Sequence, residues 1–181
     1  MSRLPAINPD HATGHAQELF RGVENRLGFI PNVLRTMANA PVVLEGYLEF
    51  SKALSKGHLP SKLREQISLA VAEINACRYC LAAHSAIGKT IGLSEETIED
   101  SRQAISPDSQ TAAVLQFVRK LVIDRGMVSH ADLAHLRGLG FGNGDIAEII
   151  ANVSLSLFTN YFNHVAETEV DFPEVSRLRA S

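Results

Sequence analysis

The sequence predicts an all-α protein, a single domain built from packed helix hairpins. Apolar residues recur at helical spacing in one segment after another, and Pro and Gly stand between these segments. Strand signals are weak, since the one Asn-Gly pair, Asn143-Gly144, precedes a helical pattern instead of joining two alternating runs. A chain of 181 residues can bury a real core without disulfide staples.

Five helices are predicted in the first half of the chain. One apolar stripe through Phe20 gives the first helix, and a Pro-Asn break precedes the second. Pro41 suits the first helical position of the third. Pro60 opens the fourth, in which apolar residues recur at i, i+4, i+7 and i+8 from Leu63, and Gly92 closes the fifth. The predicted ranges are residues 11–25, 33–38, 41–54, 60–74 and 78–91.

Four more helices are predicted in the second half. Ser94 is followed by two acidic residues, which suit the positive end of a helix dipole, and Pro107 begins a long apolar-striped helix. Ser129 is a good cap for a short helix over 130–136. The glycines of residues 138–144 indicate a helix–helix turn and not a phosphate-binding loop, because no strand precedes them. A last long helix is expected to run to about residue 165.

The domain prediction is one unit with an N-terminal arm (1–27), a core (28–173) and a C-terminal tail (174–181). Within it, residues 67–84 and 146–164 both place an apolar helical stretch before an aromatic residue and a histidine. This echo suggests a duplicated helix hairpin.

Composition and charge exclude several classes of protein. The chain is 45% hydrophobic and 20% charged, which is ordinary for a soluble globular protein. The formal charge of −3 argues against a nucleic-acid binder. No run of 18 apolar residues could span a membrane, and we expect no signal peptide. With only two cysteines, in one C-x-x-C pair, a disulfide scaffold is excluded and a cytoplasmic location is expected.

The chemistry concentrates in the pattern Cys77-x-x-Cys80-x-x-x-His84. On a helix these three positions share one face, so both sulfurs and the imidazole can converge. A helix start favours the reactive thiolate, and a histidine can exchange its proton near neutral pH. Glu65 precedes Cys77 by twelve residues, with Glu73 between them. If Glu65 faces the site, burial would raise its pKa and let it relay a proton.

Other interpretations of these residues stay open at this level. The cysteines could be inert packing residues of a non-catalytic helical oligomer. They could also hold zinc together with the histidine of the motif, with His58 or His164 as a fourth ligand. Glu65 could simply pair with Arg64 or Lys62 at the surface. His164 could instead line the thiol site.

One pattern in the sequence resembles the alkylhydroperoxidase-D-like family of the carboxymuconolactone decarboxylase superfamily. It consists of Glu65 and, starting twelve residues later, the segment Cys-Arg-Tyr-Cys-Leu-Ala-Ala-His. The flanking segments look like its peroxidase-related branch. They are Gly-Phe-Ile-Pro-Asn at residues 28–32, Asn-Tyr-Phe-Asn at 160–163 and Glu-Val-Asp-Phe-Pro at 169–173. The resemblance covers most of the chain.

The resemblance implies a thiol-dependent antioxidant enzyme that reduces alkyl hydroperoxides or protein disulfides. Cys80 would be the peroxidatic nucleophile and Cys77 the resolving residue, while Glu65 and His84 would form the proton relay. No cofactor or metal is expected. Family members are usually trimers or hexamers, and the prototype is reduced by a dihydrolipoyl partner and passes electrons to a peroxiredoxin.

Two comparisons within the superfamily refine this expectation. The true decarboxylases lack the cysteine pair, so decarboxylation is disfavoured for this chain. The prototype carries a histidine directly before the second cysteine, where this chain has Tyr79. A phenol, with a pKa near 10, is a poorer proton carrier at neutral pH.

Overall fold

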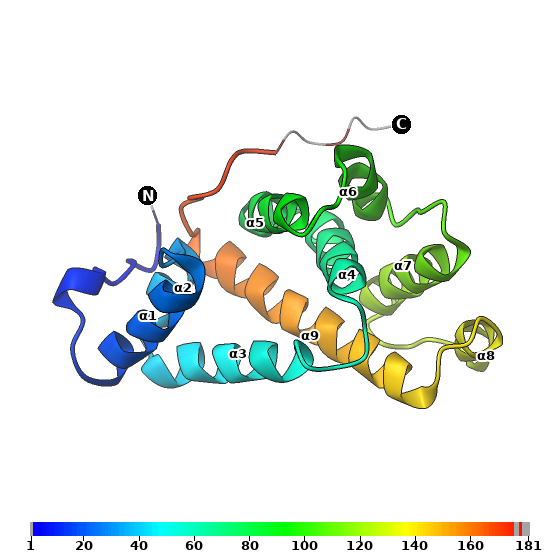
Figure 1. The fold of residues 1–181 in the computed structure, drawn as a ribbon, viewed down its shortest axis with the longest axis horizontal. Helices are drawn as coiled ribbons and strands as arrows, with labels where there is room; N and C mark the ends of the chain where they lie inside the picture. Colours follow the sequence, from blue (N-terminus) through cyan, green and yellow to red (C-terminus); the bar gives the residue numbers. More distant parts are fainter. Residues whose placement is uncertain (1, 176–177, 179–181) are drawn as a thin grey trace.

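A computed structural model describes residues 2–175 and 178, and within this part of the chain every regular element is a helix (Figure 1). The predicted all-α class is therefore confirmed. The predicted tail over 174–181 lies mostly outside the described residues. After a short 3-10 helix at Pro9–His11, the α-helices are α1 (Gly14–Leu27), α2 (Asn32–Met37), α3 (Pro41–Leu54), α4 (Ser61–Ile74), α5 (Arg78–Thr90), α6 (Glu95–Arg102), α7 (Ser109–Ile123), α8 (His130–Gly138) and α9 (Asn143–Ala166).

The helices begin where the sequence supplies capping groups. The Ser94 side chain accepts a hydrogen bond from the backbone of α6, and Asp108 does the same for α7. Ser129 and Asp132 form a reciprocal capping box at the start of α8. At the end of α1, Gly28 takes the left-handed conformation with a φ of 78°. Local signals of this kind explain why the predicted helix boundaries are close to the observed ones.

Helix α4 lies at the centre of the fold and packs against α5, α6, α7 and α9 (Figure 1). Its apolar face, with Ile67, Ala70 and Val71 fully buried, joins the largest core cluster together with α7 and α9. A second cluster forms between α1, α2 and α3, and Phe162 of α9 packs against it. Helix α9 thus contacts both clusters and connects the two ends of the molecule.

The predicted duplication of a helix hairpin is wrong. Residues 67–84 do form a hairpin, because the chain turns between α4 and α5. Residues 146–164 instead lie within the single helix α9. The apolar period is the same in both stretches, but the second has no residues that end the helix. Among the described residues, no helix is long and apolar enough to cross a membrane.

The turn between α3 and α4 is fixed by a carboxylate from α9. Glu148 accepts hydrogen bonds from the backbone N–H groups of His58 and Leu59, at 2.9 and 3.0 Å. These bonds hold the pKa of Glu148 below its usual value. A Cβ atom on Gly57 would overlap the carboxyl group of Glu148, so a larger residue here would displace this carboxylate from the turn. The turn sets where α4 starts and, through α4, where the functional residues lie.

We predict that Gly57→Ala and Glu148→Ala each destabilise the fold by about 1–2 kcal/mol, because both remove the hydrogen bonds to the α3–α4 turn. Since the two substitutions break the same contact, the double variant should lose less than the sum of the single losses. Urea unfolding of the four proteins measures this. Gly46→Ala is the control, because Gly46 has open space for a Cβ within α3 and alanine favours the helix. Additive losses would contradict the shared contact.

Candidate functional site

The two cysteines lie at the turn from α4 into α5. Ala76 takes a left-handed conformation with a φ of 51°, and the backbone N–H of Cys77 donates to Ala72 at 2.9 Å. Cys77 is the N-cap of α5, and its sulfur accepts the backbone N–H of Cys80 at 3.4 Å. The two residues form a disulfide with their Cα atoms 5.3 Å apart. Both are buried, with exposures of 1% and 2%.

This turn is held against α9 by side-chain hydrogen bonds. The Nδ2 group of Asn75 donates to Oδ1 of the fully buried Asn160 at 3.0 Å. The Nε2 atom of His164 contacts the carbonyl oxygen of Asn75 at 2.9 Å, so this ring supports the turn from its exposed side. Asn163, which also lies on α9, contacts Cys80 of α5 directly, with its Nδ2 atom 3.4 Å from Sγ. Three residues of α9 therefore position the start of α5.

Glu65 and His84 form a hydrogen-bonded pair across the packed helices α4 and α5. Nδ1 of His84 is 2.5 Å from Oε1 of Glu65, and their side chains are 23% and 13% exposed. Burial of the imidazole opposes its charged form, but the charge and hydrogen bond of Glu65 outweigh burial and raise the pKa of His84. The sequence placed His84 one turn beyond Cys80, and the structure brings Glu65 to the same imidazole.

The other charged residues of α4 have separate partners. Glu73 forms an ion pair with the buried Arg102 of α6 at 2.6 Å, which ties these two helices together. Lys62 and Arg64 donate to backbone carbonyls in neighbouring turns. The alternative of a surface pair between Glu65 and either of them is therefore wrong.

Tyr79 lies between the cysteines and fastens a segment that we call the C-terminal strap, residues 169–172. Its hydroxyl donates to Oδ1 of Asp171 at 2.8 Å and accepts the backbone N–H of Val33 at 3.2 Å. The ring packs edge-on against Phe172, with centroids 5.8 Å apart. Burial raises the pKa of Tyr79 far above its usual value, and the hydrogen bond to Asp171 adds to the effect. Tyr79 thus anchors the strap to the start of α5.

The strap connects α9 back to the start of α2. The second oxygen of Asp171 accepts the backbone N–H of Asn32 at 2.7 Å, and the Asn32 amide donates to the carbonyl of Glu169 at 3.1 Å. Val170 and Phe172 of the strap pack on the cluster of buried residues that contains both cysteines. The strap therefore helps to exclude water from the sulfur atoms.

The geometry gives no support to the zinc alternative. Throughout the described ranges, no three His, Cys, Asp or Glu side chains are arranged to hold a metal ion. His58 is exposed and lies in the α3–α4 turn, while the ring of His164 contacts a backbone carbonyl.

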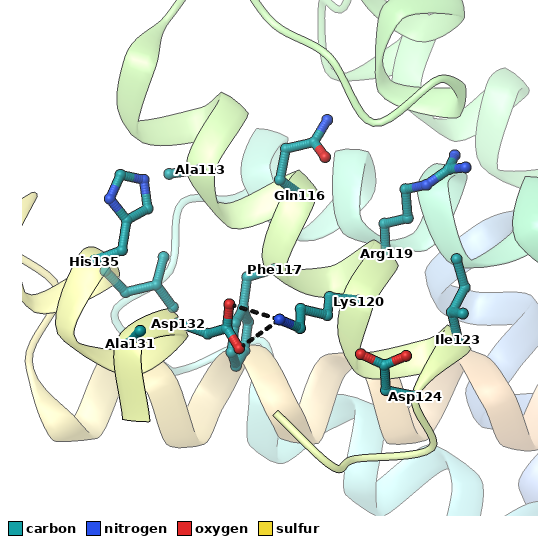
Figure 2. A pocket seen from close by; sticks show the side chains of 11 residues that line it. Ala113, Gln116, Phe117, Arg119, Lys120, Ile123, Asp124, Ala131, Asp132 and His135 are labelled. Carbon is teal, nitrogen blue, oxygen red and sulfur yellow. Dashed lines mark hydrogen bonds and ion pairs between the residues drawn. The ribbon is translucent and has the colours of Figure 1, made fainter. Parts of the chain in front are cut away.

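A cavity of about 480 Å³ opens between α7 and α8, away from the cysteine pair (Figure 2). Lys120 and Asp132 form an ion pair across it, which raises the pKa of Lys120 and lowers that of Asp132 to about 2. Figure 2 shows His135 at the other end of the cavity, on α8. None of the lining residues belongs to the cysteine site. The chemistry of the site therefore depends on buried groups and not on this open hollow.

Comparisons with known proteins show what the chain and its fold are similar to. The model of the carboxymuconolactone decarboxylase family matches residues 41–122. An uncharacterised peroxidase-related protein from Silicibacter sp. TM1040 has a similar structure, with 26% identity, a TM-score of 0.82 and coverage of 92% of this chain and 89% of that one. A second similar structure is the alkylhydroperoxidase AhpD core of an uncharacterised peroxidase-related protein from Ralstonia eutropha JMP134. It has 25% identity and a TM-score of 0.82, and the match covers 94% of this chain and 92% of that one.

A more distant structure shares the fold alone. It is a cysteine-to-alanine variant of the debrominase Bmp8 in complex with 2,3,4-tribromopyrrole, with 19% identity, a TM-score of 0.80 and coverage of 94% of this chain and 92% of that one. No curated protein sequence matches the chain significantly.

We predict that Glu65→Gln lowers the pKa of His84 below the ordinary value near 6.5, because burial remains while the compensating charge is lost. In the wild type the raised pKa adds stability that is complete below that ordinary value and is lost as the pH rises through the folded-state pKa. NMR titration of the histidines measures the change. His15, whose pKa is raised by Glu18 and Glu45 at the surface, is the internal control. An unchanged His84 midpoint would contradict the pairing.

We predict that Tyr79→Phe lowers the free energy of unfolding by about 1–3 kcal/mol, because the Val33 amide and the Asp171 carboxylate lose a buried partner. Thiol chemistry at the cysteines should survive, since the phenol keeps its proton in the hydrogen bond to Asp171 and has no part in the proposed proton transfer. Urea unfolding and peroxide-driven disulfide formation test the two statements. Tyr161→Phe, at an exposed position of α9, is the matched control and should be neutral. A stable Tyr79→Phe protein with inert thiols would refute the anchoring role.

Proposed function

We propose that the chain is a thiol-dependent peroxidase that reduces alkyl hydroperoxides, as a member of the alkylhydroperoxidase-D-like group of the carboxymuconolactone decarboxylase superfamily. The match of residues 41–122 to the model of that family and the two similar peroxidase-related structures support this proposal. The single observation that carries the proposal is the hydrogen bond between Glu65 of α4 and His84 of α5. The Cys77–Cys80 disulfide lies at the start of the same helix α5. A part-buried acid–imidazole pair, with its imidazole one helical turn beyond Cys80, could supply proton transfer where thiolate chemistry needs it.

In the first step, the thiolate of Cys80 attacks the distal oxygen of the hydroperoxide. The O–O bond breaks, Cys80 becomes a sulfenic acid, and the departing alkoxide takes a proton to leave as an alcohol. His84 lies one helical turn from Cys80, and its Nδ1 is held by Glu65. The other ring nitrogen, Nε2, is therefore the atom that we assign to proton exchange with the thiol and the leaving group.

In the second step, Cys77 resolves the sulfenic acid. The Cys77 thiol loses its proton and attacks the sulfur of Cys80, the hydroxyl group of the sulfenic acid leaves with that proton as water, and the Cys77–Cys80 disulfide is formed. Helix geometry prepares this step, since Cys77 is the N-cap of α5 and its sulfur accepts the Cys80 amide. An external dithiol then reduces the disulfide by exchange through a mixed disulfide, and both cysteines return to thiols.

Burial of the sulfurs favours a small hydroperoxide over a folded protein disulfide as the oxidant. Cys77 and Cys80 are almost fully covered, in part by the strap. A dihydrolipoyl group, as in the family prototype, suits the reducing step because its dithiol is carried on a slender arm. A peroxiredoxin is the alternative electron partner that the family resemblance implies.

We also infer that the protein acts as a homo-oligomer, a trimer or hexamer as in its family. One side of α9 carries large apolar residues that are exposed in the single chain. They are Ile150, Phe158, Tyr161 and Val165. Their spacing places them along one stripe of the helix, a pattern that a second copy of the chain could cover.

We predict that Cys80→Ser abolishes consumption of an alkyl hydroperoxide, because the nucleophilic sulfur is gone. Cys77→Ser should still react once and should accumulate a sulfenic acid at Cys80, which dimedone labels with a characteristic mass increase. Glu65→Gln should slow turnover by about 100- to 10,000-fold, the order expected for loss of general acid–base help. Dihydrolipoamide-dependent turnover and mass spectrometry measure these effects. Full turnover by Cys80→Ser would rule out the assignment.

A further inference from the structure

The two sulfur atoms of the site receive hydrogen bonds from different donors. Cys77 Sγ accepts the backbone N–H of Cys80, as the cap of α5. Cys80 Sγ is instead 3.4 Å from Nδ2 of Asn163, a side chain of α9 that is only 6% exposed. This buried amide lies 83 residues along the chain from the cysteine that it contacts.

The chemistry of sulfur fixes how the Asn163 amide is oriented. A disulfide sulfur carries no proton and can only accept a hydrogen bond, so the NH₂ end of the amide must face it. The opposite end, Oδ1, is buried and has no hydrogen-bond partner in the described structure. An unpaired buried carbonyl oxygen is costly, and an apolar side chain of this size would avoid the cost. The amide is therefore poorly explained as a packing residue.

We propose that Asn163 is a catalytic residue that stabilises the thiolate of Cys80 through its side-chain N–H. The inference rests on the proposed function and deepens it, because it identifies which of the two sulfurs the protein holds as an anion. A hydrogen bond to a charged acceptor is roughly twice as strong as one to a neutral acceptor, so the contact gains strength when Cys80 is ionised.

The same contact acts twice in the proposed cycle. Before the peroxide reacts, Asn163 favours the nucleophilic thiolate at Cys80. When an external dithiol later attacks Cys77, the electron pair of the breaking S–S bond goes to Cys80, which leaves as a thiolate. The amide then stabilises this leaving group. Attack at Cys77 is the favoured direction because the Cys80 anion has a donor supplied by a second helix.

The experiment measures the ionisation of each sulfur separately. Ultraviolet absorbance of the thiolate is followed against pH in the Cys77→Ser protein, where only Cys80 titrates, and in the Cys80→Ser protein, where only Cys77 does. Asn163→Leu removes the donor with little change in size. It should raise the Cys80 midpoint by about one pH unit, which is tenfold less thiolate at a pH below the midpoint. The Cys77 midpoint should stay where it was.

Asn163→Asp is the second variant, because it keeps the shape of the side chain and places a negative charge against the sulfur. Its upward shift should be at least as large. Asn152→Leu is the matched control, a buried asparagine of α9 about 16 Å away along the helix that bonds to a backbone carbonyl. The substitutions at Asn163 and Asn152 do not change the titratable groups of the elements packed around Cys80. These groups are Glu65 of α4, Tyr79 and His84 of α5, Asp171 of the strap and His164 of α9.

An unchanged Cys80 midpoint in both Asn163 variants would overturn the proposal, as would an equal shift at Cys77. The result is independent of peroxide activity. If the wild-type thiols ignore hydroperoxide while Asn163→Leu still shifts Cys80 alone, the proposed function fails and the role of Asn163 in stabilising the thiolate stands.

Discussion

The position of both sulfur atoms depends on how the turn between α4 and α5 is held against α9. Asn75 lies at this turn, where Asn160 and His164 bond to its side chain and to its carbonyl. The turn places Cys77 at the cap of α5, so that the backbone of the first helical turn faces its sulfur. Because α9 also carries Asn163, the same helix that fixes the turn supplies a donor to Cys80.

Burial distinguishes this thiol site from an exposed C-x-x-C pair. The strap packs on the cluster of buried residues that contains both cysteines, and Tyr79 fastens it through Asp171. The Tyr79 hydroxyl is engaged by Asp171 and Val33, and in the proposed mechanism proton transfer is assigned to the pair of Glu65 and His84. A desolvated site also strengthens the electrostatic coupling within that pair, which explains why the raised pKa of His84 survives the burial of its ring.

Local patterns in the sequence predicted the helices and part of the site, because caps, breakers and apolar periodicity act over a few residues. They also placed the cysteines and His84 on one helical face, since this follows from spacing alone. The contacts of Asn163 and Asp171 could not be predicted in this way. These residues lie 83 and 92 positions from their partners, and only the packing of α9 and the strap on α5 brings them together. His164 shows the same limit, because its place on α9 was correct while the group that it contacts was not foreseen.

In the proposed cycle, the two cysteines pass between dithiol and disulfide in response to a hydroperoxide. Its most direct test is the intact mass of the reduced wild-type protein after one equivalent of an organic hydroperoxide and then an alkylating reagent. We expect both alkylation sites to be lost together, because Cys77 and Cys80 have joined. A protein that still takes up two alkyl groups after peroxide treatment would contradict it.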